Sequence, residues 1–124
     1  MGTWGPGNFD SDTAADHLGE VTGNLIQEIE NAFNEGPSAL EPDEYWGVAV
    51  LCNLELLRVI HEKKYLGSNL PTLDQLIKWK SIYLETWEQH IDELYPKPEY
   101  KIGRKQVLTS TFDSLISIVE KSET

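Results

Sequence analysis

The sequence predicts an all-α protein, a compact and roughly antiparallel bundle of four helices that follows an irregular amino-terminal arm rich in Gly and Trp. Apolar residues recur at three- or four-residue steps in four segments, which is the spacing of one helical face. Gly or Pro stands between the segments, and such short connections favour packing of consecutive helices. The 124 residues, 40% hydrophobic and 25% charged, suit one soluble domain. We therefore expect residues 1–124 to form a single helical domain.

The arm is predicted to cover residues 1–11. Its three glycines and Pro6 are typical of irregular backbone rather than of a helix or strand. Two large apolar side chains, Trp4 and Phe9, interrupt the small residues. We expect both to anchor the arm on the helical body.

The first helix is predicted over residues 12–35, with Asp12 as its N-cap and with Gly36 and Pro37 ending it. Gly19 and Gly23 lie one turn apart in its interior, where each costs about 1 kcal/mol relative to Ala. Either another backbone approaches closely there or the helix breaks. The apolar stripe of this helix is Ala14, Leu18, Val21, Leu25, Ile29 and Ala32.

The second helix is predicted over residues 42–64, with Pro42 at its first position. Its apolar residues cover most of the circumference, which is typical of a central, buried helix. Cys52 lies within this apolar segment and, as the single cysteine, has no intrachain disulfide partner. We expect Cys52 to be a small buried hydrophobic residue.

The third helix is predicted over residues 72–95, because Thr72 and Gln75 have the spacing of a capping box. A tether over residues 97–103 leads to the fourth helix, predicted over residues 103–121. The Val, Thr, Ile and Phe residues of this last segment would also suit a strand.

Charge limits the classes of partner. The formal net charge is -11, and residues 1–57 contain eleven acidic residues and no Lys or Arg. The resulting field repels phosphate backbones and anionic lipids, so we expect no nucleic-acid partner and no membrane partner. The start of the sequence has neither the basic nor the apolar region of a secretory signal, and the longest apolar run is 48–52. We expect a cytoplasmic protein.

Catalytic motifs are not recognisable in this sequence. It contains no Gly-rich phosphate loop after a strand, no Gly-x-Ser-x-Gly motif, no paired cysteines and no zincin histidine pair. His90 lies beside Glu88 and Asp92 on a face that reads as exposed, and no general acid or base role follows from that. We therefore predict no catalytic residue and no cofactor, and favour a non-enzymatic role while leaving enzymatic activity open.

The first functional hypothesis is an interaction protein, such as an inhibitor or an immunity-type protein for a cationic toxin. A base-free acidic half would steer a basic protein partner toward the chain and accelerate encounter. A further possibility is that the acidity only keeps a component of an assembly soluble, and homo-oligomerisation would then be the observation that distinguishes it. The candidate partner-binding residues are Asp10, Asp16, Glu20, Glu28, Glu30, Glu35 and Trp46.

The alternative hypothesis is a metal-dependent or small-ligand-binding enzyme. It rests on the clustering of oxygen and nitrogen donors beside the Gly-rich arm: Asp10, Asp12, Asp16 and His17. Carboxylates at four-residue steps on one helix face repel one another unless a cation or a basic partner lies against them. The sequence leaves open whether a metal is bound.

The amino-terminal motif resembles a known family. Ten residues match the pattern Met-Gly-x-Trp-Gly-x-Gly-x-Phe-Asp-x-Asp-x-Ala-x-Asp, which is similar to the start of family 4259 of the domains of unknown function. The resemblance implies a small bacterial protein without an assigned activity, and it transfers no catalytic residue. The matching residues are Met1, Gly2, Trp4, Gly5, Gly7, Phe9, Asp10, Asp12, Ala14 and Asp16.

Overall fold

The computed structural model describes residues 2–123, so that Met1 of the motif lies outside the described part. The predicted all-α fold is confirmed: in the described residues the only β pairing is an isolated bridge between Thr3 and Ser11. Four α-helices and two short 3-10 helices follow the arm. In chain order they are α1 Asp12–Asn34, η1 Pro37–Leu40, α2 Tyr45–Glu62, α3 Leu73–His90, η2 Ile91–Leu94 and α4 Pro98–Glu123.

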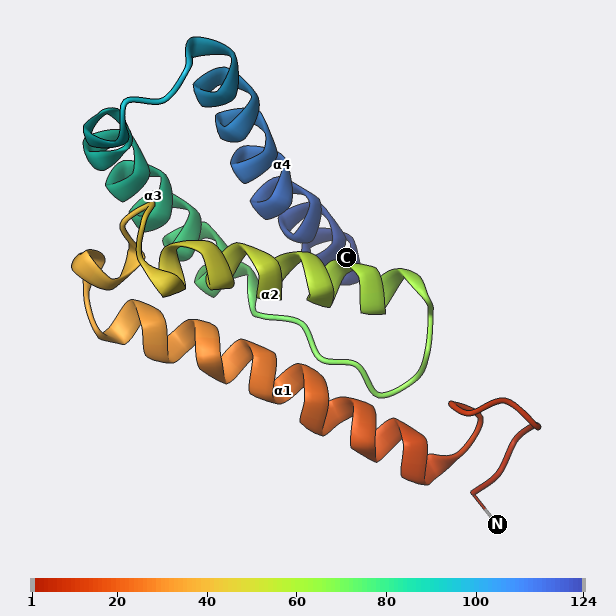
Figure 1. Ribbon diagram of the computed structural model, residues 1–124. Coiled ribbons are helices and arrows are strands. Elements are labelled where there is room, and N and C mark those ends of the chain that lie inside the picture. The colour runs from red at the N-terminus through yellow and green to blue at the C-terminus, as the bar shows by residue number, and fades with distance from the viewer. Residues whose placement is uncertain (1, 124) are drawn as a thin grey trace.

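The helices form two antiparallel hairpins, α1 with α2 and α3 with α4, which cross each other (Figure 1). The α2 helix contacts both α1 and α4, so it joins the two hairpins. A long segment, residues 63–72, connects α2 to α3 by running back along α1 (Figure 1). The arm lies at the start of α1.

The core fills the space between the hairpins with aromatic and aliphatic side chains. Trp87, Tyr83 and Phe112 are among the largest fully buried side chains. Trp79 of α3 is only 4% exposed. Its ring stacks on Phe33 of α1 with the ring centroids 5.5 Å apart. Trp79 is therefore a core residue that links α1 to α3.

Helix ends differ from their predicted positions where local signals compete. The N-cap of α1 is Ser11, whose hydroxyl accepts a hydrogen bond from the Ala14 N–H at 3.1 Å, rather than Asp12. The α2 helix begins at Tyr45, because the residues just before it form η1 and a turn. The α4 helix begins at Pro98, so that most of the predicted tether is helical. A proline fits the first turn of a helix because no N–H is required there.

The capping box of α3 is confirmed. The Thr72 hydroxyl accepts from the Gln75 N–H at 3.1 Å, and the Gln75 side chain accepts from the Thr72 N–H at 2.9 Å. The two contacts satisfy donors that the helix start leaves without partners.

Of the two glycines inside α1, Gly19 admits the backbone of the 63–72 segment, whereas a Cβ on Gly23 would lie 4.0 Å from the Asn69 side-chain nitrogen, an ordinary contact. A Cβ placed on Gly19 would lie 3.3 Å from the Gly67 carbonyl oxygen. The Asn69 side chain donates to the Gly19 carbonyl at 3.1 Å, and the Asn69 N–H donates to the buried Thr22 hydroxyl at 2.9 Å. The helix continues through both glycines, and the close approach explains the glycine at position 19.

The α2 helix, predicted to be central and buried, is buried on one side only. Val50, Leu54 and Leu57 are fully buried, but the opposite side of the helix faces solvent. Cys52 lies on that side and is exposed, which corrects its prediction as a buried residue. At 100° per residue, position 52 points away from the core face. The exposed apolar side chains of this stripe are Tyr45, Val48, Leu56 and Val59.

Candidate functional site

The arm is a closed loop whose glycines make room for an aspartate. The Trp4 N–H donates to the Asp10 carbonyl at 2.8 Å, and the Gly7 N–H donates to the Asp10 carboxylate at 2.9 Å. A Cβ on Gly5 or Gly7 would lie 2.9 Å or 2.6 Å from that carboxylate oxygen. Asp10, a predicted partner-binding residue, therefore holds the loop together.

The two aromatic residues of the arm have different environments. Phe9 stacks on Tyr65 of the 63–72 segment, with the ring centroids 4.2 Å apart and the planes 15° apart. Trp4 is 48% exposed. The expectation of two anchors is thus correct for Phe9, whereas Trp4 presents about half of its surface to solvent.

The predicted acidic residues of α1 fall into two groups. Glu28 accepts from the Asn53 side chain of α2 at 2.9 Å, and Glu30 accepts from the Gln75 side chain of α3. These two carboxylates connect helices. Asp16, Glu20 and Glu35, the C-cap residue of α1, are exposed, as is Glu28, but they lie outside these two cross-helix contacts. At 100° per residue, Asp16 and Glu20 lie roughly opposite the buried stripe of α1.

Trp46, the remaining predicted partner-binding residue, is partly buried at the start of α2. It packs against the core cluster, and its ring meets Tyr45 edge to face with the centroids 5.0 Å apart. Packing thus occupies much of the Trp46 side chain, and the neighbouring Tyr45 is 75% exposed.

Ion pairs are concentrated in the second half of the chain. Within residues 2–123, four ion pairs of Lys or Arg with an acid can be described, and each joins two residues from position 58 onward. None of the four reaches an acid of α1, so the exposed carboxylates of that helix gain no compensation from them. The pairs are Arg58 with Glu62, Lys80 with Asp113, Lys101 with Asp92, and Lys105 with Glu88.

The basic cluster Lys101, Arg104 and Lys105 lies on α4. Lys101 and Lys105 hold α4 against the end of α3 and η2. Hydrogen bonding to Asp92 raises the pKa of the Lys101 ammonium group. The charge of these two lysines thus serves the α3–α4 hairpin rather than the acidic amino-terminal half.

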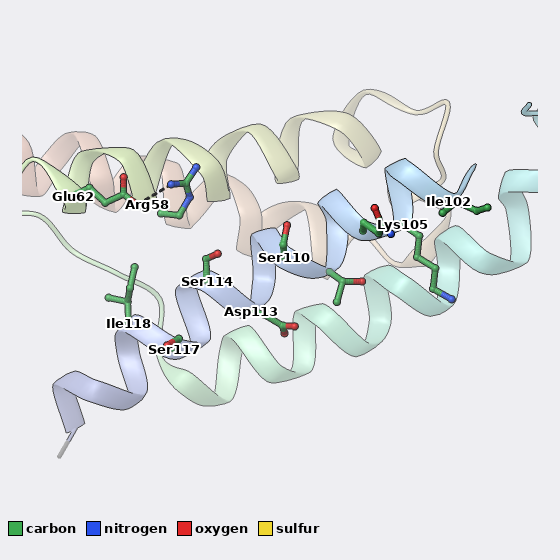
Figure 2. Close-up of a pocket in the computed structure, with 11 residues that line it drawn as sticks. Arg58, Glu62, Ile102, Lys105, Ser110, Asp113, Ser114, Ser117 and Ile118 are labelled. Carbon is green, nitrogen blue, oxygen red and sulfur yellow. Dashed lines mark hydrogen bonds and ion pairs between the residues drawn. The ribbon is translucent and has the colours of Figure 1, made fainter. Parts of the chain in front are cut away.

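A groove of about 930 Å³ follows the outer side of α4. Figure 2 shows Arg58 on α2 facing Ser110 and Ser114 on α4, while Lys105 and Asp113 lie toward α3. Each charged side chain that lines the groove belongs to one of the ion pairs above. The other lining residues are hydroxyl side chains, one amide and two isoleucines, an open surface without convergent catalytic groups.

A group of three possible metal ligands occurs elsewhere in the described residues: Glu41, His90 and Glu93, whose ligating atoms all lie within 4.8 Å of one another. The predicted set Asp10, Asp12, Asp16 and His17 does not form such a group there. Sequence reasoning missed the group, although the three-residue spacing of His90 and Glu93 is a local signal.

The family assignment follows from a sequence comparison. The model of the family described as "Domain of unknown function (DUF4259)" matches residues 2–110. The chain belongs to the DUF4259 family. The match covers the arm, the first three α-helices and half of α4 of this DUF4259 protein. Searches of curated proteins and of solved structures give no match. Among its described helices, none combines the length and the apolar character that spanning a bilayer requires.

Proposed function

We propose that this DUF4259 protein is a non-enzymatic interaction module that binds a basic protein. The contact surface, which we call the acidic face, consists of Asp12, Asp16 and Glu20 at the start of α1. The observation that carries the proposal is that these carboxylates are exposed while the ion-paired bases serve the other half of the molecule. An inhibitor or immunity-type role toward a cationic protein is consistent with this surface.

Electrostatics gives the acidic face a reason to attract a cationic partner. Carboxylates four residues apart on a helix repel each other by about 0.2–0.5 kcal/mol, and an apposed Lys or Arg converts this repulsion into attraction. Long-range steering of this kind raises association rates and weakens with salt, since the Debye length is about 8 Å at physiological ionic strength.

Trp4 adds an aromatic group next to the acidic face, because the arm that carries it leads directly into α1. Tryptophan is enriched among the residues that dominate binding energy at protein interfaces. The closed loop of the arm fixes the backbone of Trp4, so that less conformational freedom is lost on binding. We infer that Trp4 is the apolar anchor of the contact.

The test compares two variants with the same change in net charge. Asp16→Lys with Glu20→Lys reverses the acidic face, whereas Glu99→Lys with Glu120→Lys reverses two exposed carboxylates of α4. Partners are captured from the native host at low salt, and their association rates are then measured over a salt series. We expect the first variant to lower the association rate of a basic partner at least tenfold and the second to change it little.

Two results would contradict the proposal. One is a captured partner whose association rate does not depend on salt. The other is an equal loss in both variants, which would show that only the total charge matters. Trp4→Ala separates steering from contact, since it should raise the dissociation rate and leave the association rate nearly unchanged.

A further inference from the structure

Three side chains meet where the connection between α1 and α2 approaches the end of α3. Glu41 follows η1, His90 is the last residue of α3, and Glu93 belongs to η2. The Nδ1 atom of His90 lies 3.5 Å from Glu41 Oε1 and 3.3 Å from Glu93 Oε1. The His90 and Glu41 side chains are about 30% exposed, and that of Glu93 is 65% exposed.

The distances suit a shared cation, although His90 Nδ1 also lies 3.4 Å from Glu93 Oε2, a long hydrogen bond. An N–H···O hydrogen bond is about 2.7–3.2 Å long, and one Nδ1–H serves one carboxylate well. Both distances here exceed that range. In a tetrahedral site with metal–ligand bonds of about 2.0–2.2 Å, neighbouring ligand atoms lie about 3.3–3.6 Å apart. The separations of Nδ1 from the two carboxylates match this second range.

The backbone that carries Glu41 is firmly held. Its carbonyl accepts from the Glu44 N–H at 2.9 Å, and a Cβ on Gly47 would lie only 2.0 Å from the same oxygen. The buried Tyr83 hydroxyl in turn donates to the Gly47 carbonyl. Leu40, the residue before Glu41, is 1% exposed. A ligand fixed on a packed backbone loses little freedom when it binds a metal.

We propose that Glu41, His90 and Glu93 form a binding site for one divalent transition-metal ion, with Zn²⁺ as the ion of choice. One imidazole nitrogen and two carboxylate oxygens are a ligand set that Zn²⁺ accepts, and the fourth position is left to water. The two carboxylates supply negative charge that a divalent ion neutralises. The metal ties the α1–α2 connection to the end of α3.

The test uses Zn²⁺ alone, added to the full chain after treatment with EDTA. Isothermal titration calorimetry should give about one Zn²⁺ per chain, and the melting temperature should rise with Zn²⁺ concentration because the ion binds the folded state. His90→Gln and Glu93→Gln should each weaken Zn²⁺ binding at least about tenfold. Glu93→Gln alters a mostly exposed side chain, so its fold should be unchanged by circular dichroism.

The other two of the three histidines provide matched controls. His17→Gln and His61→Gln should keep both the stoichiometry and the melting shift of the unmodified chain. The proposal is overturned by a chain that shows no saturable Zn²⁺ binding. It is equally overturned if binding survives in His90→Gln and is lost in His17→Gln or His61→Gln.

Discussion

The contact between the 63–72 segment and α1 can be tested with a matched pair of glycine substitutions. Gly36 and Gly67 both have positive φ, 103° and 97°, a backbone conformation that other residues rarely adopt. A Cβ on Gly36 would have no heavy atom within 4 Å, but a Cβ on Gly67 would lie 2.2 Å from the Ala15 carbonyl oxygen. The pair therefore separates conformational strain from steric exclusion by α1.

The expected costs follow from the contacts. Gly36→Ala lowers the free energy of unfolding through backbone strain alone, by about 1–3 kcal/mol. Gly67→Ala has the same strain and also moves the segment away from α1. The segment then loses the two Asn69 hydrogen bonds, about 0.5–1.5 kcal/mol each, and the Phe9–Tyr65 stacking, about 0.5–1.5 kcal/mol. We expect Gly67→Ala to destabilise the protein by about 1.5–4.5 kcal/mol more than Gly36→Ala.

Urea unfolding followed by tryptophan fluorescence and by far-ultraviolet circular dichroism gives both free energies. The linear dependence on urea allows the two variants to be compared at the midpoint. Equal losses of stability would refute the close approach of Gly67 to α1. A smaller loss in Gly67→Ala than in Gly36→Ala would refute it as well.

Three further predictions concern single side chains. Asn53→Ala should cost about 1–3 kcal/mol in urea unfolding, because Glu28 and a backbone carbonyl lose a shared donor, whereas the exposed Gln27→Ala should stay within about 0.5 kcal/mol. Burial raises the pKa of Tyr83 from 10.0 to about 12, so the neutral phenol stabilises the folded state. This stabilisation is complete below pH 10 and should disappear between pH 10 and 12. Unfolding monitored by absorbance should show this loss of stability in the unmodified chain and should not show it in Tyr83→Phe. Cys52 should react with a disulfide reagent in the folded protein at about the rate measured in denaturant, and strong protection in the folded state would contradict its exposed position.

The elements of the fold were predictable where one local signal decides. The Thr72–Gln75 capping box lies within a single turn of chain, so its geometry needs no tertiary information. The glycines of α1 left two alternatives, a close approach of another backbone or a break in the helix, and the partner segment, 50 residues away at Asn69, was not visible from spacing.

The orientation of α2 was not predictable, because no local signal decides it. Its apolar residues surround the helix, so periodicity does not choose which side faces the core. The structure buries the polar Asn53 and exposes its neighbour Cys52, because Asn53 finds acceptors on α1. A hydrogen-bond partner 25 residues away in sequence thus outweighs the hydrophobicity of individual side chains.

The candidate sites likewise contain residues whose exposure follows from their position on one helix and residues whose contacts depend on how the helices pack. Asp16 and Glu20 were identifiable as exposed acids, because their positions on the face of one helix are a local property. Glu28 and Glu30 belong to the same acidic run, but other helices give them structural roles. The contact of Glu41 with His90 depends on how the two hairpins pack, and no spacing along the chain encodes it.

The distribution of charge connects the fold to the proposed function. The second hairpin uses its bases internally, as in Lys80–Asp113 and Lys105–Glu88, and so gains cross-helix attraction. The α1 helix contains five acidic residues and no Lys or Arg, which destabilises the isolated protein by self-repulsion. The proposed basic partner would remove that repulsion only while it is bound, so the proposal links partner binding to folding stability. Consequently, the Asp16→Lys and Glu20→Lys variant should be as stable as the unmodified chain, or more stable, at low salt while it loses the partner. A stability loss in this variant would instead assign the acids of α1 a structural role.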